Sequence, residues 1–401
     1  MTTISDESSS KVSLWYDPRV RSIISQVVLV GLITWGVYAL VTNTIHNLER
    51  LKIASGFEFL NTTAGFTLIQ SWIQYDETAT YGRAFVAGLI NTFYVAIIGI
   101  ILATLLGFLV GVARLSKSWV ISRVATVYVE VLRNIPLLLQ IIVWYKILLL
   151  LAPDKRGSIS VLGFGQMNVT GLWTSKFIAS DGFWMTGVAI VVALVLAWMV
   201  ARWAKKRQMA TGQQFPSFMA GLGIVIVLPL IVFLATGNPG VIEHPEFVSD
   251  GPMLRRGFKT GIGFVFIPEF LALLFALVLY TATFIAEIVR AGILAVDHGQ
   301  TEAAGALGLR RGKILRLVVI PQAMRVIIPP LTSQYLNLTK NSSLAMAIGY
   351  PDVMGAGGIV LNQSGQAVEL IVMIMIVYLS FSLITSLFMN WFNARMSLVE
   401  R

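Results

Sequence analysis

The residues of this sequence most able to do chemistry form a short segment that begins at Glu302. Glu302 is followed by small side chains and two leucines, and then by a basic run that ends near Pro321. A carboxylate at the start of a helix can accept backbone N–H bonds or pair with an arginine of another protein. Small side chains allow a second surface to approach the backbone, and leucines can anchor in an apolar groove. The segment predicts a docking helix whose contact residues are Glu302, Ala303, Ala304, Gly305, Leu307, Gly308, Leu309 and Pro321.

The geometry of this segment should depend on a glycine and a proline. Gly308 is expected to supply a turn, because glycine reaches positive φ without steric cost. Pro321 cannot continue a helix and biases Ile320 toward extended backbone, so the segment should end at that point. Two plainer alternatives stay open: Glu302 could only start a helix, and the Ala and Gly residues could only pack against neighbouring helices.

A second group of polar residues lies within otherwise apolar runs: Asn91, Thr92, Gln140, Thr339, Lys340, Asn341, Ser342 and Ser343. Polar groups inside a membrane are costly, so these residues are candidates for lining the pathway of a polar solute. A solute that carries a carboxylate and an ammonium group would need both donors and acceptors there. The alternatives are that Asn, Thr and Ser tie helices together, and that Lys340 reaches toward the membrane interface.

Two acid–base pairs are spaced so that their members can meet on one helix face. Glu130 with Arg133, and Glu287 with Arg290, are each three residues apart. Both pairs lie near the predicted ends of apolar runs. They are interpreted either as structural pairs that anchor helix ends or as parts of an inner gate.

The sequence contains neither the ligand spacing of a metal site nor the motif of a phosphate-binding loop. There is no cysteine, and the histidines stand alone without ligand spacing, at His46, His244 and His298. A phosphate-binding loop needs two glycines at fixed spacing, then Lys and Ser or Thr. Here Gly312 and Lys313 are followed by Ile314, and Leu307 occupies the position of the first glycine. We therefore expect no metal site, and any ATP and magnesium would be bound by a partner.

Composition indicates a membrane protein that crosses the bilayer several times. Hydrophobic residues make up 56% of the 401 residues and charged residues only 12%, and the mean hydropathy is +0.77. The formal charge of +10 does not indicate nucleic-acid binding, because the basic residues lie mostly in short loops between apolar runs. The predicted fold is an all-α transmembrane helical bundle.

Eight spans of about 20 or more apolar residues are expected, because that length crosses the hydrocarbon core. They lie at about 22–42, 85–112, 125–151, 183–201, 219–237, 266–292, 326–348 and 369–391. The first of them is too long for a signal-peptide core and is interpreted as a retained anchor. The 326–348 run contains Pro329, Pro330, Lys340 and Asn341 and is expected to be a broken helix, buried among its neighbours rather than facing lipid.

The distribution of Lys and Arg predicts the orientation of these spans. With eight spans both termini lie on one side, and the loops on that side hold eighteen Lys and Arg against nine on the other. Basic residues are retained on the cytoplasmic side. Both termini and the Glu302 segment are therefore predicted to be cytoplasmic, the latter also because Arg310, Arg311, Lys313 and Arg316 would be costly within the bilayer.

The Glu302 segment also carries a recognisable motif. Glu302-Ala303-Ala304, then Gly308 and finally Val318 with Ile320-Pro321, resembles the cytoplasmic EAA loop of permease subunits in bacterial ABC importers. Val318 and Ile320 depart conservatively from the usual Ile and Leu. Further stretches resemble the polar amino-acid importer permeases, at residues 88–92, 130–140, 282–293 and 340–344. The added length resembles the larger subunit type of the general L-amino acid permeases.

This resemblance implies a domain plan. Residues 1–84 would form an N-terminal tail, a first span and a periplasmic loop, and residues 85–401 the permease domain with a type I ABC importer core. An insertion at about 153–265 would add two spans, and the cytoplasmic EAA loop, with its coupling helix, would occupy about 297–325.

It also implies a function and partners. The chain would be a non-enzymatic subunit in the bacterial inner membrane that moves L-amino acids inward by alternating access. It would act with a second permease subunit that differs from it, two copies of an ABC ATPase that use ATP and magnesium, and a periplasmic amino-acid-binding protein. It would contact membrane lipid and no nucleic acid.

Two other functions are weighed against this one. A secondary transporter driven by an ion gradient should show charge pairs deep in its spans or an inverted repeat, and neither is evident. A membrane scaffold or sensor would move no substrate, so loss of flux when this subunit is omitted would exclude it.

Overall fold

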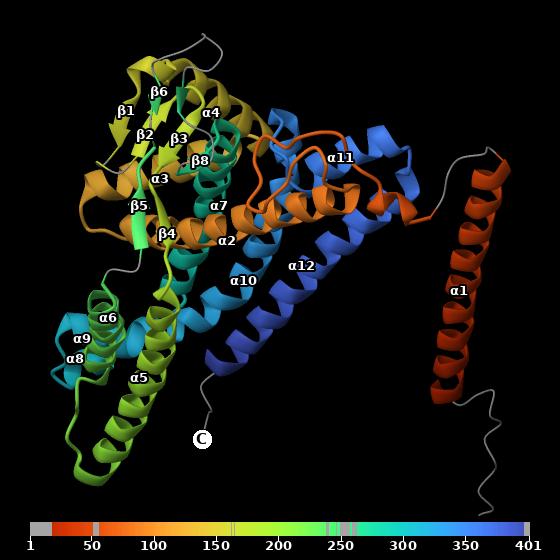
Figure 1. Ribbon diagram of the computed structural model, residues 1–401. Helices are drawn as coiled ribbons and strands as arrows, with labels where there is room; N and C mark the ends of the chain where they lie inside the picture. Colours follow the sequence, from red (N-terminus) through yellow and green to blue (C-terminus); the bar gives the residue numbers. More distant parts are fainter. Residues whose placement is uncertain are drawn as a thin grey trace, which may run out of the picture.

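The computed structural model describes residues 18–50, 56–161, 163, 165–237, 240–245, 247–248, 257–258 and 263–396. The predicted placement of both termini depends on residues 1–17 and 397–401, which lie outside these ranges. Helices dominate the fold (Figure 1): α1 (Pro18–Arg50), α2 (Tyr81–Arg114), α3 (Trp119–Asn134), α4 (Leu137–Leu151), α5 (Phe183–Thr211), α6 (Ser217–Ala235), α7 (Pro268–Leu294), α8 (His298–Ala306), α9 (Arg311–Ile314), α10 (Ile320–Asn341), α11 (Val353–Ser364) and α12 (Ala367–Met396).

The expected transmembrane bundle is confirmed, with one span built differently. Within the described residues, seven helical stretches are long and apolar enough to cross a membrane, and a bent pair would make an eighth. That pair replaces the single helix expected at 125–151, because α3 and α4 meet at 106°. The bend falls at Ile135 and Pro136, where Ile135 is extended, as a residue before proline prefers to be.

The prolines of the α10 region do not interrupt it, so two predictions were wrong. Ile320 is helical (φ −59°, ψ −48°) rather than extended, and a π-helical turn over Leu315–Val319 leads directly into α10. In this turn the Ile320 N–H bonds to Leu315 O, five residues back. The wider turn leads into Pro321, which lies in the first turn of α10, where a missing N–H costs little.

The second wrong prediction is the broken helix at 326–348, because Gly312–Ile348 forms one helical stretch. Helix α10 runs through Pro329 and Pro330 to Asn341 and then tightens into a 3-10 helix over Ser342–Ile348. Each proline lacks an N–H, so a carbonyl one turn earlier loses its hydrogen bond. Inside a helical bundle, neighbouring helices can satisfy such carbonyls, and the helix can continue. Gly349, at φ +80°, ends the 3-10 helix.

Short strands, which the sequence analysis did not expect, flank α5 and α6 in the insertion. A four-stranded antiparallel sheet has the order β1 (Ile159–Val161), β2 (Gly165–Asn168), β3 (Gly171–Thr174) and β8 (Phe264–Phe266). Two ribbons pair β4 (Lys176–Ala179) with β5 (Gly240–Glu243) and β6 (Phe247–Val248) with β7 (Gly257–Phe258). The sheet lies at the end of the molecule opposite α8 and α9 (Figure 1).

The centre of the molecule is the contact between α2 and α7. Small residues recur along α2 at intervals of four, so its backbone can approach α7 closely. A Cβ at Gly107 would lie 2.6 Å from the Cβ of Ile285, and one at Gly111 would lie 2.8 Å from that of Val289. The aromatic ring of Trp72 joins this centre to the sheet, stacking on Phe264 with ring centroids 4.8 Å apart.

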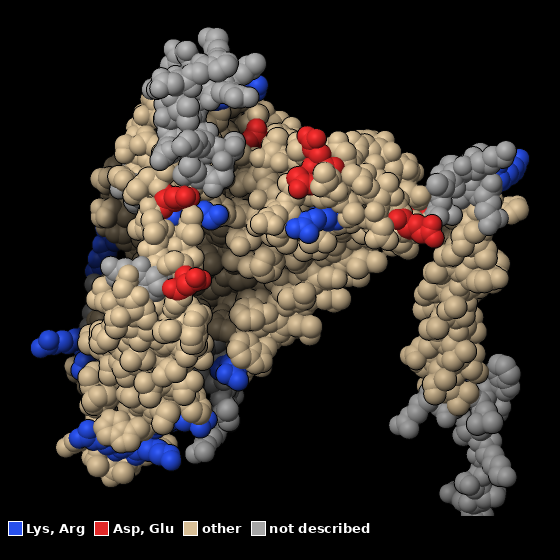
Figure 2. Space-filling model, in the orientation of Figure 1, with Lys and Arg blue, Asp and Glu red and all other residues tan. Residues whose placement is uncertain are grey.

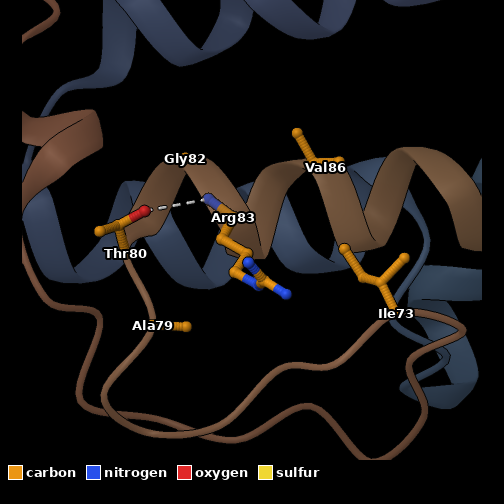
Figure 3. A pocket seen from close by; sticks show the side chains of 6 residues that line it. All are labelled: Ile73, Ala79, Thr80, Gly82, Arg83 and Val86. Atoms are coloured by element: carbon orange, nitrogen blue, oxygen red, sulfur yellow. Dashed lines mark hydrogen bonds between the residues drawn. The ribbon is translucent and has the colours of Figure 1, made fainter.

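The segment before α2 is folded against the start of that helix. The Thr80 hydroxyl accepts a bond from Arg83 N and caps α2 (Figure 3). Arg83 points from α2 toward the segment, where its Nε donates to Gln74 O at 2.7 Å. The open hollow between them is also lined by Ile73, Ala79, Gly82 and Val86.

Candidate functional site

Helix α8 is the short helix expected at the Glu302 segment. Asp297 caps its start, with Oδ1 accepting from Gly299 N at 2.7 Å. Glu302 was expected at the start of the helix, and this was wrong, because it lies one turn after His298 and Asp297 holds the capping position. Its Oε1 is 3.0 Å from Nδ1 of His298. Both side chains are exposed, at 71% and 85%. The Glu302 carboxylate is therefore open to a further partner on its solvent side.

The end of α8 confirms the turn expected at Gly308. Gly308 has φ +75° and its N–H bonds to Gly305 O, while Leu309 N bonds to Ala304 O. These two bonds form a Schellman motif, which places a left-handed residue just after the helix. Leu307 follows the last turn with 82% of its surface exposed.

The small-residue surface of α8 is open. Ala303, Gly305 and Ala306 are exposed, and Ala304 is buried against the described chain. A Cβ at Gly305 or Gly308 would meet nothing within 4 Å. The segment therefore presents backbone, a carboxylate and Leu307 to the outside, as a docking helix requires. Its role in docking stays a prediction.

Of the two predicted acid–base pairs, the structure forms one. Glu287 Oε1 accepts from Arg290 at 2.6 Å, and Glu287 Oε2 accepts from Arg114 at the end of α2. Arg114 is 10% exposed, so this contact joins α2 and α7 with little solvent around the guanidinium. The role of this pair in an inner gate stays a prediction.

The other pair, Glu130 and Arg133, is absent, and this part of the prediction was wrong. Both residues are described and both are exposed, yet they form no ion pair with each other. The Arg133 guanidinium carbon lies 5.1 Å from the ring centroid of Phe284 on α7, where cation–π attraction holds it.

Two of the predicted pathway residues serve instead to fasten α2 to the start of α11. Asn91 is fully buried, and its Nδ2 donates to Gln70 O at 3.0 Å and to Pro351 O at 2.8 Å. Thr92 is also fully buried, and its hydroxyl accepts from Val353 N at 2.9 Å. This arrangement matches the alternative that polar residues tie segments together.

Gln140 also forms hydrogen bonds to the backbone of a neighbouring segment. Its Nε2 donates to Leu132 O at 2.8 Å and to Ile135 O at 2.9 Å, and the residue is 4% exposed. These carbonyls belong to the end of α3, where the bend leaves them without helical partners. Gln140 therefore closes the bend between α3 and α4.

The five predicted pathway residues around Lys340 differ in hydrogen bonding and in exposure. The hydroxyls of Thr339, Ser342 and Ser343 bond to backbone carbonyls of their own helix, at 2.7–2.9 Å. Lys340 is exposed, and Asn341 and Ser343 are half-buried. None of the eight pathway candidates lines the pocket of about 270 Å³ between residues 67–69 and α11.

Asp352 is a buried carboxylate that the sequence analysis missed. It caps α11, with Oδ1 accepting from Gly355 N at 2.8 Å and Oδ2 accepting from the Tyr378 hydroxyl at 3.3 Å. Burial raises its pKa to about 7, against the opposing effect of these hydrogen bonds. An aspartate directly before an apolar helical run is an N-cap signal and could have identified this position.

Comparison with known proteins gives a consistent result. The profile of a family described as "Binding-protein-dependent transport system inner membrane component" matches residues 193–398. The chain is 50% identical to the General L-amino acid transport system permease protein AapQ of Rhizobium johnstonii, over 97% of this chain and 95% of that protein.

Two other relatives align over nearly the whole chain. It is 46% identical to the Putative amino-acid ABC transporter permease protein YhdX of Escherichia coli, over 98% of this chain and 99% of that protein. It is 41% identical to the Glutamate/glutamine/aspartate/asparagine transport system permease protein BztB of Rhodobacter capsulatus, over 97% and 96%. A solved amino acid ABC transporter with histidines aligns over 79% of this chain and 95% of its own, with TM-score 0.45 and 21% identity.

Proposed function

This chain belongs to the family of binding-protein-dependent transport system inner membrane components, and we propose that it couples amino-acid uptake to a partner ATPase through α8. It is a permease subunit of an ATP-binding-cassette importer of amino acids. An ion-gradient-driven secondary transporter is not supported. The cargo we propose is a broad set of L-amino acids, because the relatives named above carry general or acidic and amide amino acids in their names.

The geometry of α8 is the observation that carries the coupling proposal. The helix is fixed at its start by Asp297 and at its end by the Gly308 turn, so it can transmit force as a rigid body. The exposed side chains of α8 are mostly those of alanine and glycine. The larger side chains of Glu302, on the helix, and Leu307, just after it, are also exposed. Closure of two ATPase subunits would displace α8, and the helical path from α9 into α10 would carry the displacement into the bundle.

The other members of the complex follow from this arrangement. We propose a second, different permease subunit, two ATPase subunits that bind ATP and magnesium, and a periplasmic amino-acid-binding protein. This chain binds neither nucleotide nor metal and catalyses no hydrolysis in this scheme. Residues 1–84 would form the added N-terminal unit and residues 85–401 the permease domain.

The proposed orientation places α8, and both termini, in the cytoplasm of a bacterium. In support, Lys and Arg gather toward the end of the molecule that holds α8 and the turn between α5 and α6 (Figure 2). Asp and Glu lie mostly toward the other end in the same view. Such a bias is typical of proteins inserted with their basic loops inside.

Two glycines give a matched test of coupling. Gly308→Asp puts a branched, charged side chain at φ +75°, whereas Gly312→Asp makes the same change at a position without positive φ or close neighbours. In the assembled complex with binding protein and L-glutamate, Gly308→Asp should lower stimulated ATP hydrolysis and uptake together, and Gly312→Asp should affect them much less. Undiminished hydrolysis and uptake in Gly308→Asp would refute the proposal.

A further inference from the structure

The α5–α6 hairpin carries a concentrated positive charge that the transport proposal does not use. Its cations are Arg202, Lys205, Lys206 and Arg207, near the end of α5. No Asp or Glu occurs between Asp181 and Glu243, so the hairpin supplies no counter-charge of its own. Among the described residues, none of the four cations forms an ion pair. Their counter-charge must come from outside the described chain.

Length places these cations at a membrane surface. At about 1.5 Å per residue, the 29 residues of α5 reach about 43 Å, which exceeds the roughly 30 Å apolar core of a bilayer. The body of α5 is uniformly apolar from Val188 to Leu196. The cationic stretch therefore lies where α5 leaves the hydrocarbon core and meets lipid headgroups.

Two tryptophans fix the direction in which the arginines point. The Arg202 guanidinium carbon lies 3.9 Å from the ring centroid of Trp198, and that of Arg207 lies 5.5 Å from that of Trp203. Both tryptophans are four residues earlier on α5 and about half exposed. The arginines thus lean back toward the bilayer at the level of the indoles, which prefer the headgroup region.

The rest of the hairpin end continues this interface. Phe215 packs edge-on against Trp203 with ring centroids 5.3 Å apart, and Phe218 and Met219 are 80% and 75% exposed. Apolar side chains thus lie next to the cations, as at an anionic membrane surface. An acidic protein surface would match the charges but not the exposed phenylalanine and methionine beside them.

We propose that the end of the α5–α6 hairpin is a binding surface for anionic phospholipid headgroups, formed by Arg202, Lys205, Lys206 and Arg207 with Trp198 and Trp203. Arg202 and Lys206 are four residues apart and share one helix face with Lys205. They can contact one phosphate region together, while Arg207 contacts the neighbouring one. The surface selects negatively charged lipid over zwitterionic lipid and holds the hairpin at a fixed depth.

Lipid selectivity of the full-length chain tests this surface. The chain is reconstituted in phosphatidylcholine bilayers with a trace of spin-labelled phosphatidylglycerol or spin-labelled phosphatidylcholine, and the immobilised fractions are compared. The wild type should prefer phosphatidylglycerol, and high salt should weaken that preference. Each cation near a membrane surface contributes up to about fivefold, so R202Q/K206Q should lower the preference several-fold. K117Q/R123Q removes the same number of exposed cations, Lys117 between α2 and α3 and Arg123 on α3, and should lower the preference less, because neither stacks on a tryptophan among the described residues.

Further variants separate this proposal from its competitors. R202K/R207K keeps the charge without the guanidinium and should keep the preference. Unchanged selectivity after neutralising all four cations would overturn the proposal. If that variant kept its lipid selectivity but no longer co-purified with the ATPase subunit, the surface would serve a protein partner instead.

Discussion

The α2–α7 contact and the α5–α6 hairpin are both pairs of apolar helices, yet they are built in opposite ways. Along α2, the glycines at 107 and 111 bring its backbone within side-chain distance of α7, and two-thirds of the most apolar window of α7 is buried. On the hairpin, Gly187 and Gly223 have nothing within 4 Å of a Cβ, and only 11% of the α6 window is buried. The difference shows that α7 packs closely against α2 and its other neighbours, while most of the α6 surface makes no contact with the described chain.

The largest expected effect comes from filling a glycine of the α2–α7 contact. Gly107→Val would force its side chain against Ile285, where even a Cβ lies 2.6 Å away. Overpacking costs about 1–3 kcal/mol or more, so the purified chain should show a clearly lower Tm and the complex should lose uptake. Gly187→Val on α5 makes the same change in open space and should leave both nearly unchanged. Equal effects at the two positions would remove the distinction between core and hairpin.

A smaller effect is expected from the ion pair that closes the α2–α7 contact. Glu287→Gln leaves the Arg114 guanidinium, which is 10% exposed, without its counter-charge. Because Glu287 itself is 30% exposed, solvent moderates the loss, and about 1–2 kcal/mol is expected in a denaturant titration. Glu130→Gln, on an exposed carboxylate that forms no ion pair with the described residues, should change stability by less than about 0.5 kcal/mol. Equal losses of stability in the two variants would contradict the role of Glu287 as the counter-charge of Arg114.

A further expected effect is a pH dependence of stability that belongs to the core alone. Burial raises the pKa of Asp352 from its ordinary 3.8 to about 7. Between these values the folded protein holds a proton that the unfolded chain releases, so stability should fall as pH rises from about 4 to about 7. Asp352→Asn should remove this part of the slope of Tm against pH.

Asp76→Asn is the control for that slope. Hydrogen bonds from Thr78 lower the pKa of Asp76, so this residue contributes stability above its ordinary pKa that is lost as pH falls. Its replacement should leave the decline between about 4 and 7 in place. The hairpin has no carboxylate between Asp181 and Glu243 and cannot contribute to either trend. A slope that survives Asp352→Asn would show that other groups cause it.

The sequence predicted the features that depend on composition and on local backbone chemistry. Long apolar runs identified the spans, the small-residue segment identified α8, and glycine's conformational freedom identified the Gly308 turn. Each of these features depends on residues that lie close together in the sequence. A single sequence therefore contains what is needed to predict them.

Features that depend on contacts between distant segments were missed. The bend between α3 and α4 needed Gln140 to satisfy carbonyls at the end of α3. Asn91 was predicted to line a pathway, but Pro351 and Gln70 accept its hydrogen bonds. The β-strands of the insertion are short, and β3 pairs with β8 although Leu172 and Phe266 are 94 residues apart. A π-helical turn, which no residue pattern announces, led the helix into Pro321.

The cysteine-free sequence allows the coupling claim to be tested by crosslinking. Leu307→Cys and Met209→Cys place one thiol at sites with 82% and 81% exposure, on α8 and on the end of the hairpin. In the assembled importer, a short reagent with a maleimide for the introduced thiol and an active ester for lysine amines should join the chain to the ATPase subunit from position 307, and from position 209 it should give no such product. Equal crosslinking at both positions, or crosslinking only at 209, would contradict the claim that α8 is where the ATPase acts on this permease.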